Sequence, residues 1–285
     1  MSSVLTIAGY GLREALRRKV FAVVLLLTVG FLALFWLANH FLFQNVANIS
    51  PPVGSGIDAR AFAGATIFGL AMFGTLFLGV VLAIFLTLGV VRGDAERGLL
   101  QPLIVRPVGR VTLLVARWLG AVAVCAPYVG GVYVATMLIT GLTGHWWPDH
   151  KVVPGVELAG GVALVAAISL LGSVFLSATA NGIAVFMVFG AGLVAGLLGT
   201  IGHALSSHTL EHAAKIAAWL LPFEALYQDG LREITSNTTG LTGFLLQLGP
   251  FGGANTGGLW LRLWTLAYLL VIAALAAFGF SRRDL

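Results

Sequence analysis

Six apolar runs, each long enough to cross a bilayer, constrain the fold of this 285-residue chain more than any other feature of its sequence. A bilayer core about 30 Å thick requires roughly 20 apolar residues per helix. The runs lie at about 20–43, 62–91, 115–141, 158–179, 182–202 and 260–280. They are continuously apolar, whereas the strands of a membrane β-barrel alternate polar and apolar residues. The sequence therefore predicts an all-α polytopic membrane protein with six spans and a single transmembrane domain, residues 1–285.

The composition agrees with a protein whose surface faces lipid. Hydrophobic residues make up 59% of the chain and charged residues 9%, whereas a typical soluble domain carries about 25% charged residues. So few charges could not keep the chain in solution, which excludes a soluble enzyme, a nucleic-acid-binding module and a disordered scaffold in spite of the pI near 9.8. The single cysteine, Cys125, excludes an internal disulfide framework and a cysteine-rich metal site.

The distribution of lysine and arginine predicts the orientation in the membrane. With six spans, both termini, the 92–114 loop and the turn at Ala180–Asn181 lie on one side. That side, counted to Arg117, carries 11 of the 16 basic residues, whereas the other side carries 5 basic and 7 acidic residues. Loops rich in Lys and Arg stay in the cytoplasm. We therefore expect a multi-pass protein of the cell (plasma or inner) membrane with both termini cytoplasmic.

The connection at 203–259 is long, yet it is too apolar for an ordinary loop. Pro222 divides a helical pattern at 209–219 from a second one at 223–234, and an apolar, glycine-rich stretch follows. Backbone polar groups at membrane depth must be paired within the protein. We therefore expect interfacial or re-entrant helices that form an external lid.

The six runs contain no Asp, Glu, Lys or Arg in their central parts. Ion-coupled transporters and pumps usually require such groups inside the membrane, so any transport is expected to be powered from outside it. Small residues instead recur every four positions in two spans. They are Ser169, Ser173 and Ser177 in the fourth span, and Gly192, Gly196 and Thr200 in the fifth. Such stripes permit close helix packing, which we favour over contact with a substrate.

Two motifs bear on metal and nucleotide binding. His208 and His212 share a helix face, with Glu211 between them, in the order H-x-x-E-H. The i, i+4 spacing can hold a metal ion, but no third ligand is obvious, so a solvated helix face is favoured. The chain has no G-x-x-x-x-G-K-[ST] motif to cradle phosphate. We therefore expect neither a cofactor nor catalytic residues in this chain.

The segment between the second and third spans is more than a topogenic loop. It reads RGDAERGLLQPLIVRPVGRVTLLVARW from position 92 to 118 and places both signs of charge around an apolar stretch. Its candidate docking residues are Asp94, Glu96, Arg97, Gly98, Leu99, Leu100, Leu103, Arg106, Pro107 and Arg110. An apolar anchor flanked by ion pairs is typical of a surface that docks on another protein. The loop therefore predicts a cytoplasmic protein partner.

This loop resembles one in the type-2 ABC transporter permeases, in particular in their six-span branch described as multicopper-enzyme-maturation permeases. The family pattern is an acid, Arg-Gly, several apolar residues and an R-P-x-x-R element, here Glu96-Arg97-Gly98, 99–105 and 106–110. The sequence departs from this pattern after the glycine, where a polar residue is expected in place of leucine. Three other segments are also similar to the family: the amphipathic 12–19 with Arg13, Glu14, Arg17 and Arg18, the stretch 218–222, and the Arg-Arg-Asp close at 282–284.

The resemblance implies an arrangement of helices and a set of partners. Residues 1–19 would form an elbow helix along the inner interface, and the 92–112 loop would be a coupling helix seated in a separate ATPase. Two ATPase copies, which hold the ATP and Mg, would work with this chain and with a second permease copy or a paralogue. The predicted function is therefore the permease subunit of an ATP-driven exporter that lies in the lipid bilayer and has no enzymatic activity of its own.

Three alternative functions remain at the level of the sequence. A mechanotransmitter of the same architecture would drive a periplasmic or extracellular accessory protein through the external segment at 203–259. A secondary transporter would need ionisable side chains inside the membrane as coupling groups. An intramembrane metalloenzyme would use His208, Glu211 and His212. No nucleic-acid partner is expected.

Overall fold

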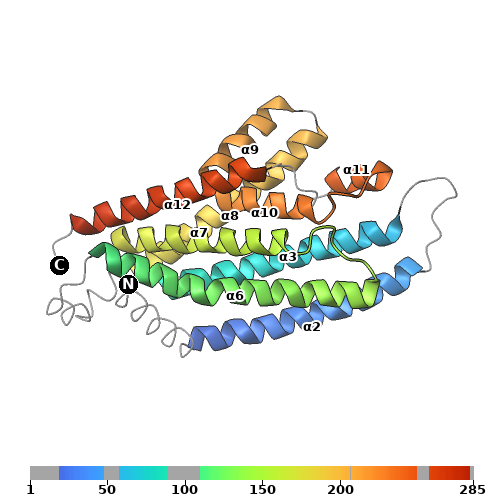
Figure 1. The fold of residues 1–285 in the computed structure, drawn as a ribbon, viewed down its shortest axis with the longest axis horizontal. Helices are drawn as coiled ribbons and strands as arrows, with labels where there is room; N and C mark the ends of the chain where they lie inside the picture. The colour runs from blue at the N-terminus through green and yellow to red at the C-terminus, as the bar shows by residue number, and fades with distance from the viewer. Residues whose placement is uncertain (1–18, 48–57, 89–109, 206, 249–256, 283–285) are drawn as a thin grey trace.

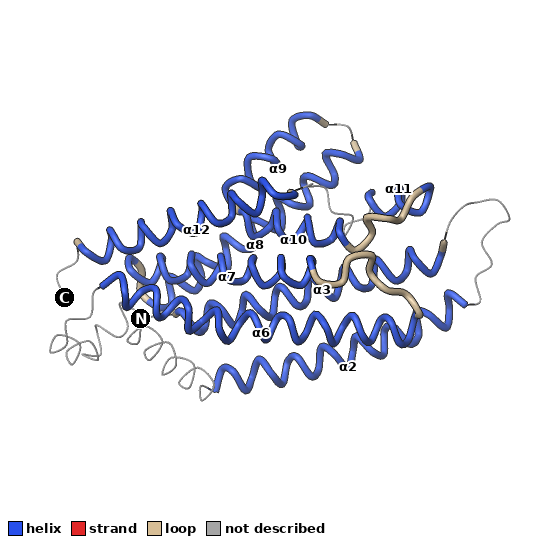
Figure 2. Tube along the Cα trace, viewed as in Figure 1, coloured by secondary structure: helices blue, strands red, loops and turns tan. Residues whose placement is uncertain are grey.

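The computed structural model describes residues 19–47, 58–88, 110–205, 207–248 and 257–282. Within these ranges the chain forms α-helices and short connections without any strand (Figure 1 and Figure 2). Among the described residues, six helices are long and apolar enough to cross a membrane. They lie side by side in an elongated bundle (Figure 1). The prediction of an all-α fold with six transmembrane helices is confirmed.

The membrane-length helices alternate in direction along the bundle. They are α2 (Lys19–Ala47), α3 (Ala59–Thr87), α6 (Arg110–Gly144), α7 (Val153–Phe175), α8 (Ala178–Ala204) and α12 (Gly258–Ser281). The connection between α8 and α12 holds the shorter helices α9 (His208–Leu220), α10 (Pro222–Glu233) and α11 (Gly240–Leu248). The predicted elbow at 1–19 and coupling helix at 92–112 lie outside the described residues, apart from position 19 and the first turn of α6.

Helix α7 begins ahead of the predicted span at 158. Pro154 stands in its first turn, where a missing N–H removes no helical hydrogen bond and the fixed φ favours the helix. This earlier start places Glu157 inside a membrane-length helix rather than in the loop before it. A carboxyl group at this position needs partners from neighbouring helices.

The break between the fourth and fifth spans also lies elsewhere than the sequence predicts. It falls at Leu176 and Ser177, and the expected turn residues Ala180 and Asn181 belong to the first turn of α8. Asn181 is accommodated there because its side-chain amide donates to the backbone carbonyl of Ser169 at 2.9 Å. The buried polar side chain is thereby partnered across the two helices.

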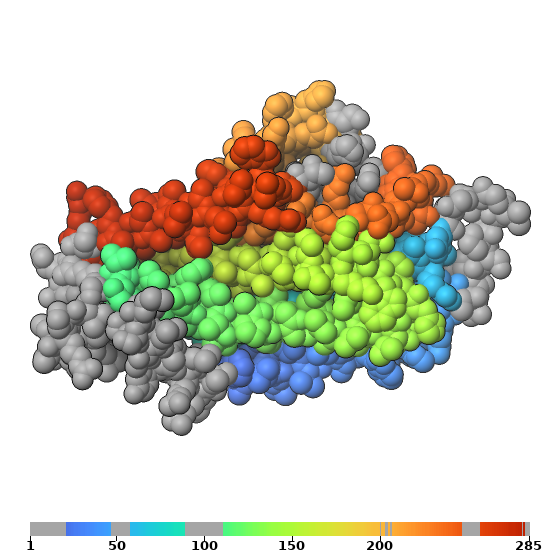
Figure 3. Space-filling model, in the orientation of Figure 1, coloured from blue at the N-terminus to red at the C-terminus, as the bar shows by residue number. Residues whose placement is uncertain are grey.

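Helices α3 and α7 form the centre of the bundle, whereas α2, α8 and α12 expose most of their apolar side chains. Phe68, Met72 and Leu76 of α3 pack with Leu158 and Val162 of α7 in the main core. Exposure of the outer helices is compatible with a bilayer, since lipid tails are as apolar as leucine. Figure 3 shows α6 across the middle of the face in view, between α12 above it and α2 below it.

Two helices of the connection between α8 and α12 fold back along the bundle. Helix α9 turns back along α8, and α10 reverses again and packs mainly on α7, with further contacts to α8, α9 and α12 (Figure 1). The expected helices therefore occupy this connection, but α10 lies inside the protein rather than along the membrane interface. Its burial brings polar side chains into contact with the neighbouring helices.

Candidate functional site: a buried charge cluster

Helix α10 is the most polar of the three helices between α8 and α12, and it is also the most buried. Every residue from Pro222 to Leu231 is buried. These residues include Glu224, Gln228 and Asp229, each of which is 3% exposed. Burial of charged and amide groups is costly unless they are partnered. The partners of these three side chains therefore define a site.

Arg262 of α12 and the backbone of Gly257 are the partners of Asp229, and Arg262 also contacts α7. Arg262 of α12 donates to Glu157 Oε1 of α7 through Nη2 at 2.8 Å and through Nε at 3.3 Å. The same Nη2 lies 3.8 Å from Asp229 Oδ2, and the Gly257 N–H donates to Asp229 Oδ1 at 2.8 Å. Arg262 therefore connects α7, α10 and α12 at one point. Glu157, Asp229 and Arg262 are named the charge cluster below.

Glycines on two sides allow the neighbouring helices to approach α10 closely. A Cβ at Gly230 of α10 would lie 3.3 Å from Glu157 Oε2 and 3.3 Å from Met72 Cε. On the opposite side, a Cβ at Gly196 of α8 would overlap Glu224 Oε1. Small residues at such contacts bring helix backbones together within a membrane protein. The buried polar side chains of α10 are consequently enclosed by protein.

The cluster brings two carboxyl groups to one guanidinium. Glu157 Oε2 and Asp229 Oδ2 are buried, and neither has a hydrogen-bond partner among the described residues. A buried charge without a counter-charge is strongly disfavoured. Arg262 therefore supplies the counter-charge that these two buried carboxyl groups need.

Glu224 lies against α8, apart from the charge cluster. Gln228 Nε2 donates to Glu224 Oε1 at 2.9 Å. Burial raises the pKa of Glu224 to about 8, although the hydrogen bond from Gln228 acts in the opposite direction. Because this pKa lies above neutral pH, Glu224 is mainly protonated at pH 7.

The small residues singled out in the sequence lie on α7 and α8. Ser169 Oγ accepts a hydrogen bond from Thr87 Oγ1 of α3 at 2.7 Å, and the buried Ser173 donates to the Leu170 carbonyl at 2.7 Å. Ser177 is exposed at the break between the two helices. Gly192 and Gly196 face α10, where a Cβ at Gly192 would lie 2.6 Å from the Phe223 ring, and Thr200 lies further along α8.

The other sequence-predicted positions are not brought to this site. His208 and His212 are exposed on α9, and His208 Nδ1 lies 3.9 Å from Glu211 Oε2. The part of the chain that the structure describes contains no group of three His, Cys, Asp or Glu side chains that could hold a metal ion. The predicted docking residues from Asp94 to Pro107, and the elbow residues Arg13, Glu14, Arg17 and Arg18, lie outside the described residues; Arg110 begins α6.

The sequence interpretation did not identify the charge cluster. Glu157 lies just before the predicted fourth span, Arg262 counts among the five basic residues of the outer side, and 223–234 is predicted as a helix of the external segment. A usable signal was nevertheless present. Arg262 lies near the start of an apolar run and needs a counter-charge, and Asp229 stands between two spans in the middle of a helical pattern.

Comparison with known protein families identifies the family of this chain. A family profile described as ABC-2 family transporter protein matches residues 5–285. No match was found among curated proteins. The profile covers the six spans and the charge cluster, and it confirms the predicted family; the multicopper-enzyme-maturation branch stays a prediction. The chain therefore belongs to the ABC-2 transporter family, as a membrane-spanning permease component, and this family implies association with ABC ATPase partners.

Proposed function

We propose that this chain is the permease subunit of an ATP-driven exporter in the cell membrane, assembled with a second permease copy or a paralogue and with two ABC ATPase subunits. The family match over residues 5–285 is the observation that carries the proposal. The ATPases would hold the ATP and Mg, since this chain has no phosphate-binding loop motif. Export is proposed from the resemblance of the loop, the elbow and the chain end to type-2 permeases.

The distribution of charge supports cytoplasmic termini. The beginnings of α2 and α6 and the end of α12 lie at the same end of the bundle (Figure 1). The segments next to these helix ends carry most of the 11 basic residues assigned to the cytoplasmic side. Positive segments are retained in the cytoplasm. The loop at 92–112, which joins α3 to α6, would then meet the ATPases on that side.

In this proposal the charge cluster holds α7, α10 and α12 together at the external end of the permease. Glu157 and Arg262 lie in the first two turns of α7 and α12, away from the beginnings of α2 and α6 (Figure 1). Hydrogen-bonded charges shared among three helices fix the register of those helices. Helix α10 would therefore move with α7 and α12 as one body when closure of the ATPases rocks the spans.

Substitution of the coupling loop tests the proposal. Glu96→Lys combined with Leu100→Asp removes one partner of an ion pair and one apolar anchor. Loss of a partly buried charge pair costs about 2–5 kcal/mol of association. The ATPase should then no longer copurify with the permease, and stimulation of its activity by the permease should be lost. Expression and membrane insertion should stay at wild-type levels, because both positions lie in a connection between spans.

A matched variant at the opposite end serves as the control. Glu211→Lys combined with Leu241→Asp makes the same two kinds of substitution on α9 and α11, where both side chains are at least partly exposed. This variant should retain the ATPase. Wild-type copurification and stimulation in Glu96→Lys with Leu100→Asp would refute the assignment of the loop as the coupling element.

A further inference from the structure

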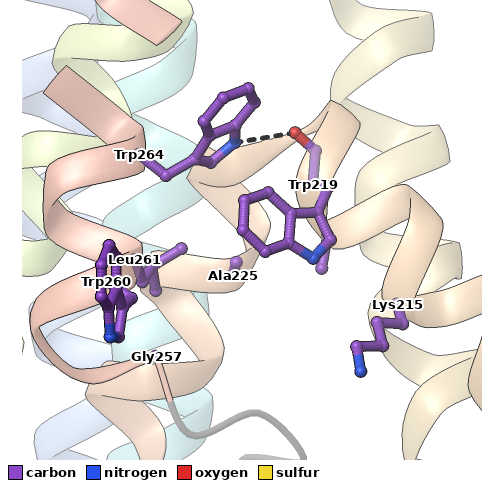
Figure 4. Close-up of a pocket in the computed structure, with 8 residues that line it drawn as sticks. Lys215, Trp219, Ala225, Gly257, Trp260, Leu261 and Trp264 are labelled. Carbon is purple, nitrogen blue, oxygen red and sulfur yellow. Dashed lines mark hydrogen bonds between the residues drawn. The ribbon is translucent and has the colours of Figure 1, made fainter. Parts of the chain in front are cut away.

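A pocket of about 210 Å³ opens between α9, α10 and α12, next to the charge cluster but separate from it. Lys215 and Trp219 of α9 form one side, Trp260 and Trp264 of α12 form the other, and Ala225 of α10 lies at the back (Figure 4). Pockets that enclose drug-sized ligands measure roughly 300–1,000 Å³. This smaller pocket can hold a compact polar group while the rest of the ligand stays outside.

The tryptophans close one end of the pocket and hold its walls together. Trp264 Nε1 donates to the Trp219 carbonyl at 3.0 Å, and the two rings meet edge to face with their centroids 5.2 Å apart. Trp260 and Lys215 flank the other end (Figure 4). Since α12 begins beside Trp260 and Trp264 lies one turn further along, the end closed by Trp219 and Trp264 lies deeper along the span than the end flanked by Trp260 and Lys215.

The surroundings of Lys215 indicate the chemistry of the ligand. The side chain of Lys215 is exposed. It has no ion-pair partner among the residues that the structure describes. The adjoining Ile216 and Leu220 are each 62% exposed on the same helix. Helices that combine lysine and tryptophan with an apolar face lie at the membrane interface and are attracted to anionic lipids. An anionic lipid head group can supply a counter-charge for Lys215.

The exposed apolar surface continues from the pocket toward the other end of α12. Leu263, Leu266 and Leu270 are exposed along this helix, and the 81% exposed Trp260 stands at the rim, where amphipathic rings prefer the interface. A cation at the mouth and apolar side chains below it match a ligand with an anionic head and long apolar tails. A phospholipid has this distribution of polarity.

We propose that the pocket binds the head group of an anionic phospholipid, with its phosphate paired to the Lys215 ammonium and its acyl chains along α9 and α12. The assignment to the outer leaflet rests on the proposed orientation, whereas the site itself does not. An anionic head group is favoured over a zwitterionic one because no described acidic side chain lines the pocket to receive an ammonium group.

Lipid titration of the purified full-length chain tests this site. Native mass spectrometry would count phosphatidylglycerol molecules bound per chain, with phosphatidylethanolamine and inorganic phosphate in parallel. Lys215→Gln should weaken the tightest phosphatidylglycerol site about fivefold, the factor that corresponds to one basic residue near an anionic surface. Trp260→Ala should weaken it as well. Both side chains are exposed, so the melting temperature should not change.

Lys151→Gln is the matched control. Lys151 lies 5.2 Å from the centroid of the Trp147 ring and is also exposed, but it does not line the pocket. This variant should bind phosphatidylglycerol like the wild type. An equal loss in Lys151→Gln, equal binding of phosphatidylethanolamine, displacement of the lipid by inorganic phosphate, or a changed oligomeric state in Lys215→Gln would each overturn the proposal. The measurement uses the permease alone, so its outcome is independent of coupling to the ATPase.

Discussion

Helices α9 and α10 follow each other in the chain and have similar lengths, 13 and 12 residues, but they are buried to opposite extents. Helix α9 buries only Ala214 and exposes Ile216, Trp219 and Leu220. Helix α10 buries every residue from Pro222 to Leu231, its charged and amide side chains included. In a soluble protein the more apolar of two such helices would be expected inside. Here the more polar helix is inside.

The difference follows from the solvent around the spans. Apolar side chains lose little when they face lipid tails, so the exposed residues of α9 need no protein cover. Ionisable side chains within a membrane-spanning helix face the protein interior and find partners there. Glu157 and Arg262 provide such partners for α10. Pairing of polar groups, rather than apolar surface, therefore decides which of the two helices is enclosed.

Removal of Arg262 should have the largest effect on this arrangement. Arg262→Met keeps much of the aliphatic stem but leaves Glu157 and Asp229 without their cation. Breaking a fully buried pair costs roughly 3–5 kcal/mol. Because the Arg262 side chain is 45% exposed, we expect about 2–3 kcal/mol of lost stability. Unfolding by heat or SDS in detergent would measure it.

Arg60→Met provides the control for that substitution. Arg60 is exposed in the first turn of α3, outside the charge cluster. Its replacement should shift stability by less than about 0.5 kcal/mol, as is usual for surface positions. Equal losses in the two variants would show that α10 is held by something other than its polar partners.

The pH dependence of stability should report the burial of Glu224. Burial raises the pKa of Glu224 to about 8 in the folded state, against about 4.3 for an unperturbed glutamate. Between these two values the folded chain keeps a proton that the unfolded chain has lost. Stability should therefore fall as pH rises from about 5 to about 8, by at most about 1.4 kcal/mol per pH unit.

Glu224→Gln should remove this contribution, because the amide does not titrate. Melting temperatures of the wild type and Glu224→Gln at a series of pH values would show whether the slopes differ. Parallel slopes would mean that Glu224 is solvated and that α10 is less enclosed than the structure indicates.

The sequence was sufficient for the six spans because each span is a local property of one continuous apolar run. The charge cluster could not be predicted in the same way. Arg262 and Glu157 are 105 residues apart in the chain, and no periodicity connects them to Asp229. Asn181 illustrates the same limit, since it was interpreted as a turn residue, whereas its hydrogen bond to Ser169 allows it to stand within a helix.

The predicted coupling loop differs from the charge cluster in the kind of argument that supports it. Its residues, from Asp94 to Arg110, were identified by their order along the chain and by resemblance to a family. The family is now established, but the role of each residue stays a prediction. The charge cluster, in contrast, rests on distances between side chains and was found only in three dimensions.

Two glycines of α8 offer the finest test of how closely α10 is seated. A Cβ at Gly196 would overlap Glu224 Oε1, whereas a Cβ at Gly190 would meet nothing within 4 Å. Both positions lie inside the same helix, so alanine brings each about 0.5–1 kcal/mol of helix preference. Gly190→Ala should therefore stabilise the protein slightly.

Gly196→Ala should lose that gain, since overpacking costs typically 1–3 kcal/mol. The obstructing atom is the end of a glutamate side chain that can shift, so we expect a loss near the lower limit, about 1 kcal/mol relative to Gly190→Ala. Melting temperatures of the two variants, compared directly, isolate the contact between α8 and α10 from the shared change in helix preference. Equal stabilisation in both variants would place α10 further from α8 and remove the glycine contact as a cause of its burial.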